Sequence, residues 1–400
     1  MYLKTKISGI MKKMYTFLPL LTLAFVLVSC INDDVEIKQE YYYPEELVIL
    51  EKTLNLPAEP LSYNVELPQH VSRSGLFARP INKDMATLGR VLFYDKALSS
   101  TGEVSCSSCH QQENAFADAK ALSDGVNNSV TTRNSLALGS VVSFAAYYGN
   151  STFGGAGVPF MWDNRFGTAA EQAIDAFTNP EEMGLSHGEL VNIVQGKDYY
   201  APLFRRAFGS KDVNEDRILA AIAEFVDGLG TFHSDFDIAA EKANVTTNFN
   251  VSFPSFTASQ NRGKEIYLDN CASCHSASFG RPILNAANNG LDMQYADEGI
   301  GGNTGIVFEK YLFKVPTLRN IALTAPYMHD GRFASLEDVV DFYSDNIADH
   351  PRLNNLLRDT QGNPKRLNLS DTDKLALIDF LETLTDNKYT SEERYSNPFK

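Results

Sequence analysis

The chain has 400 residues, 44% of them hydrophobic, which is enough for a large buried core in one or two domains. Its net charge of −15 argues against a nucleic-acid partner, because such binding needs Lys and Arg to neutralise phosphates. An acidic surface suits a basic protein partner, although it also fits simple solubility.

Residues 1–29 have the pattern of an export signal. Two lysines precede an apolar run, 17–28, that is too short to span a bilayer and is typical of a signal-peptide core. The run is followed by a serine and then Cys30, which resembles the bacterial lipobox. We therefore expect cleavage before Cys30, acylation of this cysteine, and a periplasmic or cell-envelope lipoprotein that meets the membrane only through its lipid anchor. The alternative is an ordinary signal peptide with an incidental cysteine.

Two folded domains are expected after this segment. Residues 30–60 are polar and acidic, and we interpret them as a tether. The N-terminal domain should span 61–245 and the C-terminal domain 246–400, with the boundary in a polar stretch rich in Asn and Thr. A weak internal repeat supports two similar units.

The repeat consists of Gly89–Asp95 and Gly263–Asp269, each of which we interpret as a short helix that runs toward a pair of cysteines. Apolar spacing or capping motifs predict further helices over 168–177, 215–229, 335–344 and 370–384. Glycine-rich loops are expected over 148–157 and 299–305. No run of alternating strands is evident, so the expected fold class is mainly α.

Two C-x-x-C-H motifs carry the most specific chemistry. They comprise Cys106, Cys109 and His110 in the first copy and Cys271, Cys274 and His275 in the second. In this pattern, two thiols add across the vinyl groups of haem and the adjacent His ligates the iron. A zinc site would need four converging ligands, and a thioredoxin-like pair would not need a His after both copies. The motifs therefore predict two covalent haems c.

Two haems leave electron carriage, peroxidase activity and sensing open. A peroxidase needs one haem with an open sixth position and a nearby acid–base group. That group moves a proton from the near to the far peroxide oxygen, so that water can leave. The second haem then supplies electrons, and the remaining motifs have to distinguish these functions.

The remaining motifs resemble the bacterial di-haem cytochrome c peroxidases, including the MauG branch, from about residue 61 to the C-terminus. They are Arg133-Asn134-Ser135, Met161-Trp162-Asp163, Asn179 to Met183, Lys314 to Asn320 and Tyr327 to Gly331. The resemblance implies two cytochrome c-type domains, each with one covalent haem c, and an interface between them. It also implies hydrogen peroxide as substrate and a small c-type cytochrome as electron donor.

The same resemblance implies roles for three side chains. Glu182 would lie over the peroxidatic iron of His110, and Gln172 would line the same pocket. Trp162, the only tryptophan, would lie between the two haems. Without the resemblance, Glu182 would be an ordinary solvated glutamate and Trp162 a large core residue.

The chain departs from the family pattern at the N-terminal haem. Other members close this haem with a histidine sixteen residues after the proximal one, and here that residue is Val126. The next histidine after His110 is His187, which we expect at the surface. The N-terminal haem should therefore be five-coordinate or water-bound without reductive activation. Three further histidines lack a motif and are expected to be structural or exposed: His70, His233 and His350.

The second departure concerns the sixth ligand of the C-terminal haem. Other members use a methionine fourteen residues after the histidine that corresponds to His329, and here that residue is Tyr343. MauG-type enzymes use a tyrosine at this position. A phenolate is a hard anionic donor, so it should stabilise ferric iron and lower the reduction potential. Met328 and Met293 remain alternative ligands.

The resemblance also implies a calcium ion between the domains. Its ligands would be the side chain of Asn134, the backbone carbonyls of Thr324 and Pro326, and water, a set of hard oxygen donors that suits Ca²⁺. Otherwise Asn134 could simply cap a turn.

We therefore predict a di-haem peroxidase that reduces hydrogen peroxide to water with electrons from a small c-type cytochrome. Electrons would enter at the haem of His275 and pass near Trp162. One alternative is a MauG-like oxidase that acts on Trp or Tyr residues of a partner protein, which Tyr343 favours chemically. The other is a non-catalytic di-haem electron carrier, against which Gln172 and Glu182 argue.

Overall fold

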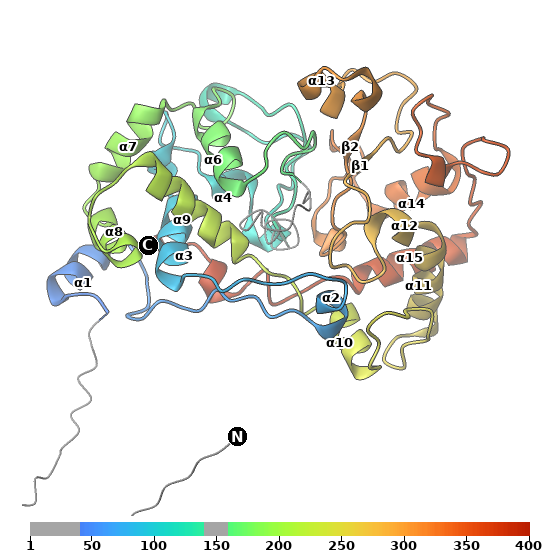
Figure 1. Ribbon diagram of the computed structural model, residues 1–400, viewed down its shortest axis with the longest axis horizontal. Coiled ribbons are helices and arrows are strands. Elements are labelled where there is room, and N and C mark those ends of the chain that lie inside the picture. Colours follow the sequence, from blue (N-terminus) through green and yellow to red (C-terminus); the bar gives the residue numbers. More distant parts are fainter. Residues whose placement is uncertain (1–40, 140–158) are drawn as a thin grey trace, which may run out of the picture. The chain divides into compact units, whose positions relative to one another are not determined.

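The computed structural model describes residues 41–139 and 159–400 (Figure 1). The expected signal segment, Cys30 and the glycine-rich loop at 148–157 lie outside these ranges. The described chain is mainly helical, which confirms the predicted fold class. None of its helices has the length and hydropathy that a membrane span requires.

The first half contains α1 (Pro44–Leu50), α2 (Gln69–Ser72), α3 (Lys83–Tyr94), α4 (Cys106–Cys109), α6 (Ala169–Thr178), α7 (His187–Gln195), α8 (Tyr200–Phe208) and α9 (Glu215–Asp227). The second half contains α10 (Asp235–Lys242), α11 (Ala258–Asn270), α12 (Ala272–His275), α13 (Ile300–Thr304), α14 (Leu336–Asp345) and α15 (Asp371–Glu382). Two short strands, β1 (Ala286–Ala287) and β2 (Phe313–Lys314), pair antiparallel. Helix α13 occupies the segment expected to be a glycine-rich loop at 299–305.

Polar caps start three of the predicted helices. The side chains of Thr168, Ser335 and Ser370 each accept a hydrogen bond from the backbone N–H three residues later. At Thr168 and Ser335, the acid at that third position also accepts a bond from the cap, which completes a capping box. These local bonds satisfy backbone donors that would otherwise be unpaired, so the predicted helix starts are confirmed.

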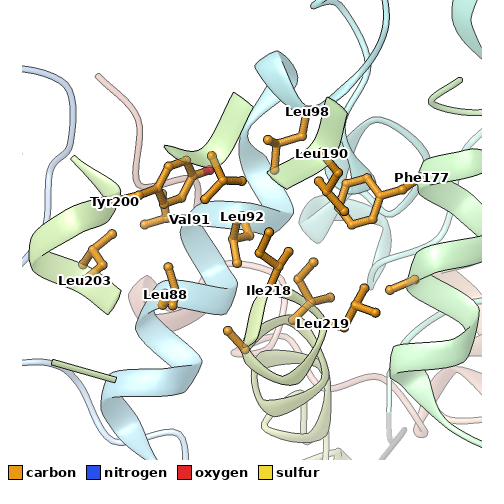
Figure 2. Packing of buried hydrophobic residues seen from close by; sticks show 14 of the residues in the cluster. Leu88, Val91, Leu92, Leu98, Phe177, Leu190, Tyr200, Leu203, Ile218 and Leu219 are labelled. Atoms are coloured by element: carbon orange, nitrogen blue, oxygen red, sulfur yellow. The ribbon is translucent and has the colours of Figure 1, made fainter. Parts of the chain in front are cut away.

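Two apolar clusters form the main cores. In the first, α3 supplies Leu88, Val91 and Leu92, which lie between α8 and α9 (Figure 2). The second gathers around α11 and α15 and includes Tyr267 and Phe380. Each cluster lies beside one C-x-x-C-H motif, because Cys106 packs against the first and Cys271 against the second.

The internal repeat corresponds to a repeated helix crossing. A Cβ atom on Gly89 of α3 would lie 1.9 Å from the carbonyl oxygen of Ala221 in α9. A Cβ atom on Gly263 of α11 would lie 1.8 Å from the carbonyl oxygen of Ala376 in α15. Only glycine permits so close an approach of two helix backbones. The two halves of the chain are therefore built around equivalent helix pairs.

Gly263→Ala is expected to reduce the free energy of unfolding by about 1–3 kcal/mol, because the added methyl group must force α11 and α15 apart. The measurement is urea unfolding followed by circular dichroism at the helical band. Gly188→Ala is the matched control, since a Cβ atom at Gly188 in α7 would meet nothing within 4 Å. Equal destabilisation of both variants would contradict close packing as the cause.

Residues 41–60, which the sequence suggested to be part of an acidic tether, are folded. Leu50 and Leu54 are buried in the first cluster. Glu46 is buried as well, and Arg205 of α8 forms an ion pair with it. The acidic composition of this segment therefore does not keep it out of the core, because Glu46 is neutralised by Arg205 and Leu50 is buried.

Elements on either side of the expected boundary pack with the other half of the chain. Phe236 and Ala240 of α10 are buried in the second cluster, although the expected boundary at 245 places them in the first domain. Near the C-terminus, Tyr389 and Tyr395 pack with Phe93 of the first half. The two halves therefore exchange elements at both ends, and the boundary at 245 stays a prediction.

Candidate functional site

The first C-x-x-C-H motif forms one helical turn, α4, beside a cavity of about 350 Å³ that Cys109 and His110 line. The Nδ1 atom of His110 lies 2.9 Å from the carbonyl oxygen of Phe116. A proton on Nδ1 donated to this carbonyl leaves Nε2 as the metal-binding atom. Burial lowers the pKa of His110, so the imidazole is neutral, as a metal ligand must be.

The second motif repeats this arrangement at a cavity of about 260 Å³ that Cys271, Cys274 and His275 line. The Nδ1 atom of His275 lies 3.0 Å from the carbonyl oxygen of Pro316, and burial lowers the pKa of His275 to about 4. None of the four cysteines of the two motifs forms a disulfide. In the described ranges, no three His, Cys, Asp or Glu side chains converge as the zinc alternative requires. The residues fit one covalent haem at each cavity.

Glu182 and Gln172 both lie in the wall of the His110 cavity. The Nδ2 atom of Asn179 donates a hydrogen bond of 2.9 Å to Oε1 of Glu182. Burial raises the pKa of Glu182, so this carboxyl group is a stronger base than an exposed glutamate. The neighbouring Glu181 is exposed. Both glutamates line the cavity, and they differ in burial: Glu182 is partly buried, whereas Glu181 is exposed to solvent.

The loop around Val126 is fixed against the segment that carries Glu182. The backbone N–H of Val126 donates to the carbonyl oxygen of Glu182 at 3.0 Å, and Ser129 Oγ donates to that of Glu181 at 2.9 Å. His110 is the one histidine among the described residues that line this cavity. His187 is exposed and lies 2.7 Å from a carboxylate oxygen of Glu215. This arrangement supports the predicted open position at the first haem.

Trp162 lines both cavities, as predicted for a residue between two haems. Its indole Nε1 donates to the carbonyl oxygen of Asn134 at 2.9 Å, and its own carbonyl accepts from the backbone N–H of Lys314 at 2.8 Å. Asn134 in turn donates its backbone N–H to the carbonyl oxygen of His329 at 2.8 Å. These bonds hold the indole between segments from both halves of the chain.

Two of the three candidate sixth ligands for the second haem lie in its cavity. Tyr343 and Met328 both line the space beside His275, whereas Met293 is 56% exposed and does not. Burial raises the pKa of Tyr343 to about 12. The alternative in which Met293 ligates the iron is therefore wrong, because its side chain faces solvent.

The three expected calcium ligands, Asn134, Thr324 and Pro326, line the second cavity together. Asn134 is buried, and its Nδ2 donates to the carbonyl oxygens of Lys120 and Ala121, each at 3.2 Å. These two bonds orient the amide, so that Oδ1 faces away from both carbonyls.

Two side chains at the site, Arg133 and Lys314, belong to quoted motifs but had no assigned role in the sequence analysis. Arg133 belongs to a quoted motif, but only the structure shows that it donates bidentately to Asp297, at 2.7 and 2.9 Å, and lies 2.7 Å from Asp163. Lys314 lines both cavities, and its Nζ donates to the carbonyl oxygen of Pro159 at 2.5 Å. Burial lowers the pKa of Lys314 to about 7. No spacing signal marks these contacts, because each joins distant segments.

Comparisons with known proteins cover both halves. The family described as "Di-haem cytochrome c peroxidase" matches residues 83–244, and the family described as "Cytochrome c" matches residues 260–385. The methylamine utilization protein MauG of Methylorubrum extorquens is 30% identical over 77% of this chain and 80% of its own length. The cytochrome c551 peroxidase of Nitrosomonas europaea is 32% identical over 66% of this chain and 73% of its own. A solved MauG-like protein associated with microbial copper homeostasis is 30% identical, with a TM-score of 0.66, over 84% of this chain and 97% of that one.

Proposed function

The chain belongs to the di-haem cytochrome c peroxidase and MauG family, and from this premise we propose that it reduces hydrogen peroxide to water with electrons from a small c-type cytochrome. One observation carries the proposal. Glu182 and Gln172 lie in the cavity of His110, whose described lining contains no second histidine. Peroxide would have room there beside an acid–base group.

Cys106, Cys109 and His110 would hold the haem of this cavity, and the bound iron would supply the redox chemistry of O–O cleavage. Glu182 would accept a proton from one peroxide oxygen and return it to the other, so that water leaves. Asn179 fixes the Oε1 atom of Glu182 for this transfer. The amide of Gln172 would orient the peroxide by a hydrogen bond.

Trp162 lies in the wall of both cavities and offers a route for electrons from the haem held by Cys271, Cys274 and His275. A MauG-like oxidase of Trp or Tyr residues on a partner protein is the second candidate, favoured by Tyr343 in the cavity of His275. Non-catalytic electron carriage is the third, and the convergence of Glu182 with Gln172 in one cavity argues against it.

Steady-state oxidation of reduced cytochrome c by peroxide tests the proposal, and sustained turnover is expected. A long-lived oxidised protein that forms with peroxide but does not oxidise cytochrome would favour the MauG-like reaction. A fully low-spin ferric protein that is inert to peroxide would leave only electron carriage.

We also propose the calcium site of Asn134, Thr324 and Pro326. Asn134→Ala is expected to weaken calcium binding at least ~10-fold, because mutations even in the outer shell of metal sites reach that size. Isothermal titration of chelator-treated protein measures the affinity, and Asn303→Ala on exposed helix α13 is the control. Equal affinity of both variants would exclude Asn134 as a ligand.

The exported lipoprotein remains a proposal that rests on residues 1–30. Cys30→Ser is expected to abolish incorporation of labelled fatty acid into the protein, because the thiol that is acylated is lost. Metabolic labelling followed by immunoprecipitation measures this change. A variant that is labelled to the same extent as the wild-type protein would contradict the lipid anchor.

A further inference from the structure

Asn289 contacts both donors that compete for the second haem. Its Nδ2 atom donates to the Oη atom of Tyr343 at 3.3 Å and lies 3.6 Å from the Sδ atom of Met328. Its Oδ1 atom accepts the backbone N–H of Leu291 at 3.2 Å. This last bond orients the amide, because it places the oxygen on the backbone and turns the nitrogen toward the two donors.

The loop that carries Asn289 has little freedom to move. Asn288 is buried, and its Nδ2 donates to the carbonyl oxygen of Tyr311 at 2.9 Å. Gly290 has a φ of +73°, and a Cβ atom there would lie 2.7 Å from the carbonyl oxygen of Ala348, just after α14. The backbone N–H of Ala348 donates to the carbonyl oxygen of Gly290 at 2.8 Å. The amide of Asn289 is therefore held at a set distance from the helix of Tyr343.

Met328 is held by its backbone. It has a φ of +73°, a left-handed conformation that a methionine rarely adopts. Its carbonyl oxygen accepts the N–H of Gly331 at 3.2 Å, and the carbonyl of the next residue, His329, accepts the N–H of Asn134. Such strained residues persist where the surroundings hold them, and they concentrate at functional sites.

We propose that Asn289 is a positioning residue that selects Tyr343 over Met328 as the sixth ligand of the haem at His275. An oxygen accepts an N–H hydrogen bond far better than a thioether sulfur does, so one donor shared between them favours the oxygen. The bond strengthens further when the acceptor is an anionic phenolate. The inference rests on the haem of the proposed function but not on peroxide turnover.

The choice of donor has a redox consequence. A phenolate is a hard ligand that stabilises ferric iron, whereas a thioether is soft and raises the reduction potential. By favouring Tyr343, Asn289 would keep the potential of this haem low. Its side chain would thus set how readily the second haem gives up electrons.

Asn289→Leu in the haem-loaded protein tests the inference, since leucine has a similar size and no donor. The ratio of thioether to phenolate ligation is expected to rise about tenfold or more, the factor for removing one hydrogen bond to a charged acceptor. The ferric spectrum should lose the phenolate-to-iron charge-transfer band and gain the far-red thioether band. The midpoint potential of this haem should shift upward.

Three variants complete the experiment. Asn289→Leu combined with Met328→Leu should lose the thioether band, which identifies the incoming donor. Met293→Leu, at an exposed methionine, should keep the wild-type spectrum. Asn289→Ser keeps an oxygen near the N–H of Leu291 but ends short of Tyr343, so it repeats the test if the leucine variant misfolds.

An unchanged spectrum and potential in both Asn289→Leu and Asn289→Ser would overturn the inference, as would a thioether band in the wild-type protein. The measurement needs no peroxide, so it separates this inference from the proposed reaction. If the protein shows no peroxidase turnover but its spectrum responds to Asn289→Leu, the role of Asn289 stands and the proposed reaction is wrong.

Discussion

Glu182→Gln is expected to lower peroxide-dependent oxidation of cytochrome c by at least ~10²-fold, the contribution typical of a general acid–base group. Glutamine keeps the size of the side chain and an oxygen that can accept from Nδ2 of Asn179, the partner of the wild-type carboxylate. It cannot take up and release the proton. The loss should therefore appear in kcat at saturating peroxide, while haem content stays at the wild-type value.

Glu181→Gln is the matched control, because Glu181 is the adjacent exposed glutamate. It should retain turnover close to that of the wild-type protein. Equal rates for the wild-type protein and the Glu182 variant would remove Glu182 from the mechanism. Equal losses in both variants would point to a general effect on the segment.

The pH dependence gives a second signature of Glu182. Burial raises its pKa above the ordinary value of 4.5. As pH falls through this raised pKa, Glu182 becomes protonated and can no longer accept a proton from peroxide. The acidic limb of the rate profile should therefore lie above pH 4.5, and it should disappear in the Glu182→Gln variant.

Asp237→Ala is expected to reduce the free energy of unfolding by about 3–5 kcal/mol, the cost of breaking a buried ion pair on one side. Asp237 is only 2% exposed and accepts hydrogen bonds from both terminal nitrogens of Arg319, at 2.8 and 2.9 Å. The Nε2 atom of His70 lies 3.1 Å away. Without the carboxylate, the buried guanidinium of Arg319 would lose its counter-charge. Urea unfolding at neutral pH measures the change.

Asp235→Ala is the control, since Asp235 is exposed two residues earlier in the same helix, α10. Its effect should stay within about 0.5–1 kcal/mol, as expected of a surface acid at a helix N-terminus. A loss of similar size in both variants would mean that the ion pair contributes little.

Acid should reduce the difference between the wild-type protein and the Asp237 variant. The neighbouring cations hold the pKa of Asp237 well below its usual value of 3.8. A carboxylate whose pKa is lower in the folded state than in the unfolded state stabilises the fold. Its contribution is complete above the unfolded-state pKa and declines as the pH falls toward the folded-state pKa. The difference in unfolding free energy between the wild-type protein and the Asp237 variant should therefore be smaller below pH 4 than at pH 7. A difference that is constant over this range would contradict the assignment.

The ion pair of Asp237 also explains a motif that had only a family association in the sequence. Arg319 belongs to the run from Lys314 to Asn320, and it connects three segments. Besides Asp237, it donates from Nε to the carbonyl oxygen of Phe279 at 2.8 Å and from Nη1 to that of Thr231 at 3.0 Å. The same run supplies Pro316, which orients His275. The charge of Arg319 thus holds the wall of the second cavity in place.

The sequence by itself determined the features whose chemistry is local. Two thiols and a histidine on one helical turn are adjacent in the chain, so the spacing at Cys106 and Cys271 is sufficient to predict haem attachment. The caps at Thr168 and Ser335 are local for the same reason, because the side chain bonds to a backbone group three residues later. Family motifs added Glu182, which the structure brings to the cavity of His110.

Only the tertiary structure decided which distant side chains meet. Asn289 lies 39 residues from Met328 and 54 from Tyr343, and the two partners of the Arg319 ion pair are 82 residues apart. Helix α10 joins the second core although its sequence neighbours suggested the first. A hydrogen bond or a buried charge depends on positions in space, and the path of the chain between two partners leaves no periodic signal in the sequence that connects them.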